Sequence, residues 1–177
     1  FYFYVCFLAW LNQHLNIPAI TVSKASKREL ELQTPLKNIH VIYNGLESRS
    51  EIKSYGLRTN WGIAENKIII GMIGPIDAHK GHPTILNVFH LSKILKKTAH
   101  FVIVGSGDEV LVSDLKSKVR VYELEDVVTF TGFLSEDSNT LIRVFDILAM
   151  STTDFEGFGY SMAEAMLAGI PVVASQV

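Results

Sequence analysis

From residue 67 onward, short apolar runs alternate with longer stretches whose apolar residues recur every three or four positions. The apolar runs predict strands over residues 68–73, 100–104, 127–131, 147–150 and 171–174. The periodic stretches predict helices over residues 83–97, 109–123, 136–145 and 160–168. Strands that alternate with amphipathic helices are typical of a parallel sheet covered on both faces. We therefore predict a doubly wound, Rossmann-like α/β domain over residues 66–177.

The same periodicity predicts which side of a helix is buried. On the 83–97 helix, the expected packing side consists of Ile85, Val88, Phe89, Leu91 and Leu95. On the 160–168 helix, it consists of Met162, Ala165, Met166 and Gly169.

Before residue 66 the predicted strands and helices are fewer and mostly shorter. It predicts the end of a helix in residues 1–16, a strand at 18–23, a helix at 26–32 that Ser23 can cap, and a strand at 39–43. We interpret residues 1–46 as the tail of another Rossmann-like domain. Residues 47–65 are mostly polar, with Ile52, Leu57, Trp61 and Ile63 as apolar anchors. They predict an interdomain linker with a short helix.

Composition narrows the class of protein. The 177 residues carry a net charge of −2 with acidic and basic residues interspersed, which argues against a nucleic-acid surface. The single Cys6 excludes an internal disulfide and favours a reducing compartment. The uncharged run 1–11 is too short to span a membrane, and we interpret it as a buried or interfacial helix of a chain cut from a longer protein. Scattered histidines give no metal-ligand cluster.

Ligands of doubly wound sheets bind beyond the carboxyl ends of the strands, so the loops that follow them are the candidate sites. After the first strand come Gly74, Lys80 and Gly81. A lysine there can reach a phosphate as a point charge, whereas in isolation it would be a solvated residue beside a helix. After the second strand, Gly105-Ser106-Gly107 resembles a dinucleotide fingerprint whose third glycine is replaced by Val110.

The last loop and helix carry two carboxylates, Glu156 and Glu164, around the sequence Gly157-Phe158-Gly159. The helix starts directly after the glycines, so its free N–H groups make an anion site. A diphosphate could lie there, with the two glutamates accepting hydrogen bonds from the hydroxyls of a sugar and a ribose. Ser161 lies on the same side as Glu164, and Gly169 and Pro171 end the helix.

Two glutamates separated by seven residues inside FEGFGYSMAEAMLAGIPVVAS closely resemble the signature of retaining GT-B glycosyltransferases of the family 4 (group 1) type. The resemblance covers roughly residues 21–177 and implies the C-terminal, donor-binding half of a GT-B fold. The loop after the first strand resembles the family's G-R-x-x-x-x-K-G segment. Lys80 matches the lysine, but Pro75 stands where the arginine is expected, so another cation such as His79 would have to replace it.

The resemblance also implies the roles of individual residues. Lys80 and Glu156 would be catalytic, Lys80 on the leaving diphosphate and Glu156 on the sugar hydroxyls. The implied donor-binding residues are Gly74, Lys80, Gly81, Gly105, Gly107, Phe133, Thr152, Glu156, Gly157, Phe158, Gly159, Ser161 and Glu164. Phe133 would lie near the nucleotide base or, alternatively, in the core. Thr152 would bond a phosphate or cap a turn. No metal or other cofactor is expected.

The implied reaction is transfer of a sugar from a nucleotide-diphosphate donor to a carbohydrate or lipid-linked acceptor, with retention, in polysaccharide, lipopolysaccharide or glycolipid biosynthesis. The protein would be cytoplasmic or peripheral to the membrane, it would bind no nucleic acid, and this fragment alone would be inactive. Two alternatives stay open. One is a non-catalytic or degenerate nucleotide-binding module, favoured by Pro75. The other is an NAD-dependent dehydrogenase domain, suggested by Gly105-Ser106-Gly107.

Overall fold

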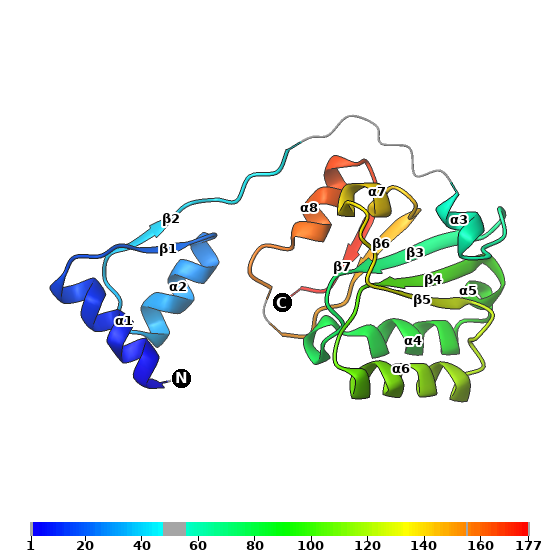
Figure 1. The fold of residues 1–177 in the computed structure, drawn as a ribbon, viewed down its shortest axis with the longest axis horizontal. Helices are drawn as coiled ribbons and strands as arrows, with labels where there is room; N and C mark the ends of the chain where they lie inside the picture. Colours follow the sequence, from blue (N-terminus) through cyan, green and yellow to red (C-terminus); the bar gives the residue numbers. More distant parts are fainter. Residues whose placement is uncertain (1, 48–55, 155, 177) are drawn as a thin grey trace. The chain divides into compact units, whose positions relative to one another are not determined.

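The structure is a computed structural model that describes residues 2–47, 56–154 and 156–176. The chain divides into two compact units, Phe1–Glu47 and Ser48–Val177, each of which has its own secondary structure (Figure 1). Within the predicted linker, residues 48–55, including Ile52, lie outside the described residues, whereas residues 56–65 are described and contain the short helix Leu57–Asn60.

The first unit is a small α/β element. It contains helix α1 (Tyr2–His14), strand β1 (Ala19–Thr21), helix α2 (Lys24–Gln33) and strand β2 (Ile39–Val41). The two strands pair in parallel, with Ile20 opposite His40. The buried amide of Asn12 ties α1 to the segment before β2, since its Nδ2 donates to the Ile17 carbonyl at 2.8 Å and its Oδ1 accepts from the Lys37 amide at 3.0 Å. Ser23 caps α2 as predicted, accepting from the Ser26 amide at 3.0 Å.

The second unit is built on a parallel sheet of five strands in the order β5-β4-β3-β6-β7. The strands are β3 (Ile68–Ile73), β4 (Ala99–Val104), β5 (Val128–Gly132), β6 (Ile147–Met150) and β7 (Val172–Ala174). The chain order reverses beside β3, which pairs with both β4 and β6. All six residues of β4 are buried, as expected of a central parallel strand.

Helices cover both faces of this sheet (Figure 1). They are α3 (Leu57–Asn60), the short 3₁₀ helix η1 (Ala78–Lys80), α4 (His82–Leu91), α5 (Lys93–Thr98), α6 (Glu109–Val121), α7 (Ser138–Ile142) and α8 (Tyr160–Leu167). One core cluster joins Met72 of β3 to Leu86 and Phe89 of α4 and to Leu115 of α6. A second cluster, on the other face, joins Ile69 of β3 to α7 and α8. The doubly wound α/β prediction is therefore confirmed.

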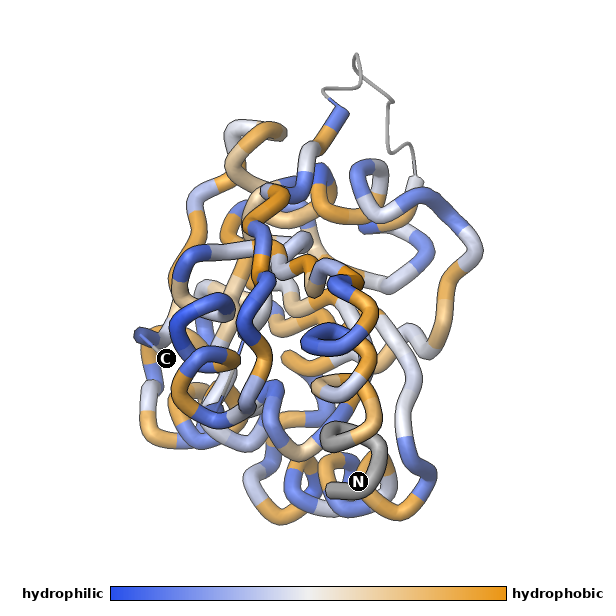
Figure 2. The backbone as a smooth tube through the Cα atoms, turned by 90° about the vertical axis from the view of Figure 1, so that its left-hand side faces the viewer, coloured by the Kyte–Doolittle hydropathy of each residue, from blue (hydrophilic) through white to orange (hydrophobic). Residues whose placement is uncertain are grey.

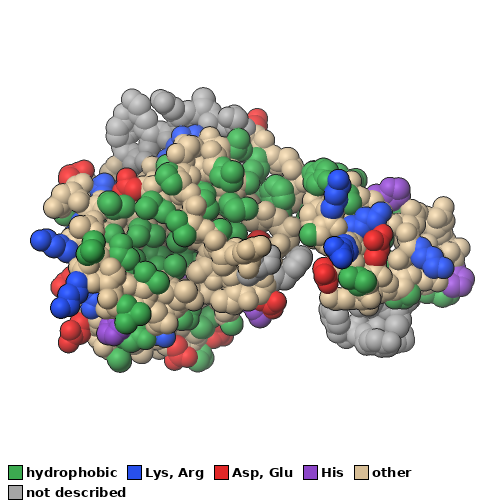
Figure 3. All heavy atoms as spheres, turned by 180° about the vertical axis from the view of Figure 1, so that it is seen from behind, with side chains coloured by type: hydrophobic (Ala, Val, Ile, Leu, Met, Phe, Trp, Pro, Cys, Tyr) green, Lys and Arg blue, Asp and Glu red, His purple; other side chains and the backbone are tan. Residues whose placement is uncertain are grey.

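Charged and apolar residues are mixed along the chain, whose net charge is −2. Hydrophobic and hydrophilic stretches alternate along the backbone (Figure 2), as amphipathic helices require. On the face seen in Figure 3, basic and acidic side chains are interspersed around hydrophobic ones.

The structure corrects two helices. The predicted 83–97 helix is two helices, because Ser92 leaves the helical conformation (φ −101°, ψ 103°) and its side chain accepts from the Leu95 amide to begin α5. The packing side of α4 also differs from the prediction: Leu86 and Phe89 are fully buried, whereas Val88 and Leu91 are 45% and 81% exposed. The predicted 136–145 helix is only Ser138–Ile142, and a tighter turn after it places Phe145 in the core.

The face predicted for the last helix is also only partly right. Ala165 of α8 is fully buried, but Met166 is 66% exposed. The helix ends as the sequence predicts, in a Schellman motif around Gly169. The Ile170 amide donates to the Ala165 carbonyl at 2.9 Å, the Gly169 amide donates to that of Met166 at 3.1 Å, and Gly169 has a φ of +75°.

Candidate functional site

A cavity of about 360 Å³ lies where β3 and β6 end and α8 begins. This is the edge of the sheet at which its chain order reverses, the usual binding edge of such folds. The cavity brings together six of the predicted site residues: Gly74, Lys80, Glu156, Gly159, Ser161 and Glu164. They come from two segments of the chain, residues 74–80 and 156–164, that are far apart in the sequence, so the convergence is a product of the fold.

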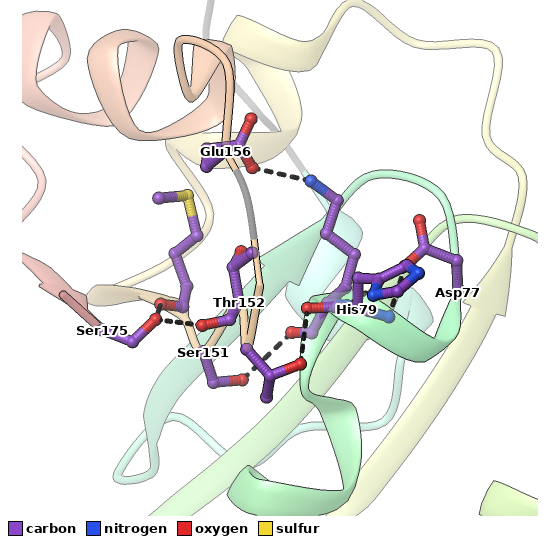
Figure 4. A network of polar contacts seen from close by, with 9 residues as sticks. Asp77, His79, Ser151, Thr152, Glu156 and Ser175 are labelled. Atoms are coloured by element: carbon purple, nitrogen blue, oxygen red, sulfur yellow. Dashed lines mark hydrogen bonds and ion pairs between the residues drawn. The ribbon is translucent and has the colours of Figure 1, made fainter. Parts of the chain in front are cut away.

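The most direct contact in this cavity joins the two residues predicted to be catalytic. Lys80 Nζ lies 2.7 Å from Glu156 Oε2, as the dashed line to Glu156 in Figure 4 shows. Their side chains are 30% and 21% exposed, so the pair is accessible from the cavity but largely screened from bulk water. A cation and a carboxylate thus face the same small volume.

Lys80 owes its position to the turn that carries it. Asp77 caps η1, because its Oδ1 accepts from the amides of His79 at 2.8 Å and Lys80 at 3.1 Å (Figure 4). Gly81 then turns the chain with a φ of +71° and passes so close to the next loop that a Cβ would lie 1.9 Å from the Ser151 carbonyl oxygen. A side chain is therefore excluded at Gly81 for two reasons at once.

The loop after β6 is bonded to this turn over its length. Ser151 Oγ donates to the Gly81 carbonyl at 2.8 Å, and the Thr153 amide donates to the His79 carbonyl at 2.8 Å. Figure 4 shows Ser151 of the one loop and His79 of the other, with dashed lines marking hydrogen bonds between the two loops. These hydrogen bonds hold the start of the loop after β6 against the turn that carries Lys80, and Glu156 lies further along the same loop. Phe155, beside Glu156, lies outside the described residues.

The opposite wall of the cavity is the start of α8. Gly159 has a φ of +74° and provides no side-chain cap, and Tyr160 and Ser161 line the cavity directly after it. Uncapped amide groups at a helix start favour an anion. Glu164, one turn later, accepts a hydrogen bond from Ser138 Oγ of α7 through its Oε1, at 3.0 Å.

A second cavity, of about 390 Å³, shares Gly74, Pro75 and Ser138 with the first and so adjoins it. Gly105 and Phe133 are among its lining residues. The Phe133 side chain is 77% exposed, so the alternative that it belongs to the core is wrong.

Gly105 and Gly107 have a structural explanation. A Cβ on Gly105 would lie 1.9 Å from the Gly74 carbonyl oxygen, and one on Gly107 would lie 1.9 Å from that of Ile76. The Ile76 amide also donates to the Ser106 carbonyl at 2.9 Å. The two glycines thus let the loops after β3 and β4 pack backbone against backbone, which accounts for the pattern that suggested a dinucleotide fingerprint.

Several predicted residues do not line either cavity: Gly81, Gly107, Thr152, Gly157 and Phe158. Thr152 is 1% exposed, and its Oγ1 has no hydrogen-bond partner within the described part of the chain. The Phe158 ring packs edge-on against Tyr160, with 4.9 Å between ring centroids. His79, the suggested replacement for an arginine, lies 3.5 Å from Asp154 on the surface.

Among the lining residues that sequence reasoning did not assign to the site are His82, Glu136, Ser138 and Tyr160. Each directly follows or adjoins a glycine or loop that had been singled out, which was the available signal. His82 begins α4 and is 3% exposed, and its Nδ1 has no partner among the described residues. Burial lowers the pKa of His82, and the Lys80 charge lowers it further while Asp77 opposes the shift. Burial therefore favours the neutral form of the His82 imidazole.

The described residues contain no group of three or more His, Cys, Asp or Glu side chains arranged to hold a metal ion. None of the helices in the described ranges has the length and apolar character needed to cross a bilayer.

Comparison with known proteins identifies the class of chain. Residues 56–177 match the family of glycosyl transferases group 1. An uncharacterized glycosyltransferase of Methanocaldococcus jannaschii is 30% identical over 96% of this chain and 45% of its own length. The N-acetyl-alpha-D-glucosaminyl L-malate synthase of Bacillus anthracis is 27% identical over 83% of this chain and 38% of its own length.

Solved structures show the same fold. HepE from Anabaena, in complex with UDP and glucose, superposes with a TM-score of 0.82 at 26% identity, over 96% of this chain and 47% of HepE. WaaG, a glycosyltransferase involved in lipopolysaccharide biosynthesis, superposes with a TM-score of 0.73 at 17% identity, over 86% of this chain and 42% of WaaG. The α/β fold with its five-stranded parallel sheet thus matches GT-B glycosyltransferase structures. The chain spans less than half the length of these relatives.

Proposed function

The chain belongs to the family of group 1 glycosyl transferases, and on this premise we propose that it binds a nucleotide-diphosphate sugar and transfers the sugar to an acceptor with retention of anomeric configuration. The observation that carries the proposal is the convergence of Lys80, Glu156 and the start of α8 on one cavity. The structure of HepE with UDP and glucose supports a donor of this class.

The charges in the cavity suit the bond that would break. Cleavage between the sugar C1 and the diphosphate builds negative charge on the leaving group and positive charge on the sugar. Lys80 and the amides at the start of α8 would stabilise the leaving diphosphate. Glu156, next to Lys80, would accept hydrogen bonds from the sugar hydroxyls. The acceptor would attack from the face that the diphosphate leaves, which preserves the anomeric configuration.

The two adjoining cavities suit the two ends of a nucleotide sugar. The first holds the charged residues and would take the diphosphate and sugar. The second, with Phe133 and the backbone of Gly105, would take the base. Lys80 supplies a cation on the diphosphate although Pro75 replaces the arginine expected near it.

The acceptor and the pathway are proposed from the names of the relatives. An O-antigen biosynthesis glycosyltransferase of Escherichia coli is 26% identical over 96% of this chain. We extend the proposal to a carbohydrate or lipid-linked acceptor, in the biosynthesis of a polysaccharide, lipopolysaccharide or glycolipid, with the protein in the cytoplasm or at the inner membrane surface.

Calorimetric titration with UDP, GDP, ADP and NAD tests the proposal. We expect one nucleoside diphosphate to bind best and Lys80→Ala to weaken it by about 10- to 100-fold, as loss of a charge-assisted contact predicts. Glu156→Gln should leave or raise the affinity for the free nucleotide, because it releases Lys80 and removes a negative charge. Lys93→Ala is the matched control, since Lys93 is exposed on α5 and lines neither cavity.

The outcomes separate the alternatives. Preferential binding of NAD would favour the dehydrogenase. Equal effects of Lys80→Ala and Lys93→Ala on nucleotide affinity would show that Lys80 does not contact the nucleotide. A full-length protein that binds a nucleoside diphosphate but transfers no sugar from any nucleotide sugar would be a non-catalytic module.

A further inference from the structure

The contact between Ser138 and Glu164 joins two helices that are distant in the sequence. Ser138 is the first residue of α7, and its Oγ donates to Oε1 of Glu164, on α8, at 3.0 Å. The helices pack together through a shared core that includes Leu141, Ile142 and Ala165. The backbone under both partners is therefore held by buried residues, and the hydrogen bond is a fixed feature of the wall.

Ser138 also lies where the two cavities meet. It lines both of them, as do Gly74 and Pro75, whereas Lys80 and Glu156 line only the first and Phe133 only the second. A nucleoside diphosphate with its phosphates beside Lys80 and its base beside Phe133 has its ribose between these groups. The ribose would then lie at the junction, next to Ser138 and Glu164.

We propose that Ser138 is a positioning residue that holds the Glu164 carboxylate in the orientation that recognises the ribose hydroxyls of the donor. The bond from Ser138 engages Oε1. Oε2 is then free to accept from a ribose hydroxyl, because a carboxylate offers acceptor sites on both oxygens. This inference rests on the proposed function, since it assumes that the ligand is a nucleotide.

The physical benefit is preorganisation. An unrestrained glutamate loses the freedom of several side-chain torsions when it binds a ligand, and that loss weakens binding. The Ser138 hydrogen bond restricts those torsions before the nucleotide arrives. Ser138 therefore acts through Glu164, and its removal should affect nucleotides that carry ribose hydroxyls more than those that lack them.

The experiment measures the affinities for UDP and GDP and for their 2′,3′-dideoxy analogues. For the nucleotide that binds better, we expect the ribose form to bind at least about tenfold more tightly than the dideoxy form. Ser138→Ala should reduce this ratio by about fivefold, and Ser138→Thr should retain it because the hydroxyl is kept. Ser135→Ala is the matched control, since Ser135 is exposed three residues earlier and lines neither cavity.

A second set of variants distinguishes positioning from direct contact. In a Glu164→Gln background, Ser138→Ala should change the ratio by less than about twofold, because its effect passes through the carboxylate. An equal loss in both backgrounds would mean that Ser138 itself binds the ribose and would overturn the proposal. If Ser138→Ala does not fold, Ser138→Cys, close in size but a weak donor, should show the same loss of ratio.

The remaining outcomes separate this inference from the proposed function. An unchanged ratio in folded Ser138→Ala, with nucleotide binding intact, overturns the inference alone. Failure of the unmodified protein to bind any of these nucleotides overturns the proposed function and the inference with it.

Discussion

The loops that follow β3 and β4 have similar glycine patterns but different roles in the structure. The loop after β3 runs from Gly74 to Gly81 and brings Lys80 to within 2.7 Å of Glu156 at the first cavity. The loop after β4 contains Gly105 and Gly107, whose missing side chains make room for the backbone of the first loop. The second loop supports the first, and it is the first that carries charge into the cavity.

The comparison shows what a glycine pattern can and cannot indicate. A G-x-G turn after a strand is compatible with close approach to a phosphate and equally with close approach to another strand's loop. Here the carbonyl oxygens of Gly74 and Ile76 occupy the space where side chains on Gly105 and Gly107 would lie. The functional signal lies in the cationic residue beside the glycine: the first loop has Lys80 next to Gly81, whereas the second has Asp108 next to Gly107.

The largest effect that we expect comes from Gly81→Ala. The added Cβ would sit at a φ of +71° and 1.9 Å from the Ser151 carbonyl oxygen. We expect a loss of about 3 to 5 kcal/mol in the free energy of unfolding, at the upper end for single substitutions, because backbone must move. Denaturant unfolding monitored by circular dichroism measures it.

Gly132→Ala is the matched control for Gly81→Ala. Gly132 has the same φ of +71°, but no atom lies within 4 Å of its added Cβ. It should lose only the strain of the left-handed conformation, about 1 to 2 kcal/mol. Equal losses in the two variants would show that the contact with the Ser151 carbonyl does not constrain the chain.

The features of the structure that the sequence predicts are those with a local signal or a general rule behind them. Strand and helix positions follow from local periodicity, and all five strands of the sheet were found within a few residues. The convergence of Lys80, Glu156 and Glu164 followed from the rule that ligands bind at the carboxyl edge of the sheet. The end of α8 at Gly169 is likewise a local signal, written in the residues that form the Schellman motif.

The remaining features depend on contacts between distant segments. Gly107 meets Ile76, and Ser138 meets Glu164, across 31 and 26 residues of sequence. The break at Ser92 divides a stretch whose apolar period continues without interruption, and the hydroxyl that caps α5 outweighs that period. Periodicity cannot reveal such competition, because it records burial and not hydrogen bonding.

A smaller effect should come from two capping aspartates: Asp77, which caps η1 within the first loop, and Asp108, which caps α6 after the second. Asp77 accepts from the His79 and Lys80 amides in the first loop, and Asp108 accepts from the Val110 and Leu111 amides in the second. Replacing either by alanine should cost about 1 kcal/mol of stability. Thermal unfolding of the two variants measures this shared effect.

The two caps should differ in ligand binding. Asp77→Ala loosens the turn that holds Lys80 and should also weaken nucleoside diphosphate binding several-fold, whereas Asp108→Ala should not. Calorimetric titration with UDP and GDP provides that comparison. Loss of affinity in Asp108→Ala alone would reverse the roles assigned to the two loops.

The smallest effect concerns pH. His82, at the end of the first loop, and His100, in the strand that leads to the second, both have a pKa lowered mainly by burial, to which the Lys67 and Arg58 charges add at His100. The unfolded chain therefore binds protons more readily than the folded one. Stability should be complete above the ordinary histidine pKa of about 6.5 and should decline as the pH falls through and below it.

Addition of nucleotide should change the pKa of His82 but not that of His100. His82 lines the first cavity, so a bound diphosphate would favour its protonated form and raise its pKa. His100 is bonded to Thr129 Oγ1 at 2.8 Å and lies outside that cavity, so its pKa should not change. NMR titration of the imidazole signals with and without UDP or GDP measures both shifts. Equal shifts would imply a change in the whole domain, and a shift of His100 alone would place the anion away from the first loop.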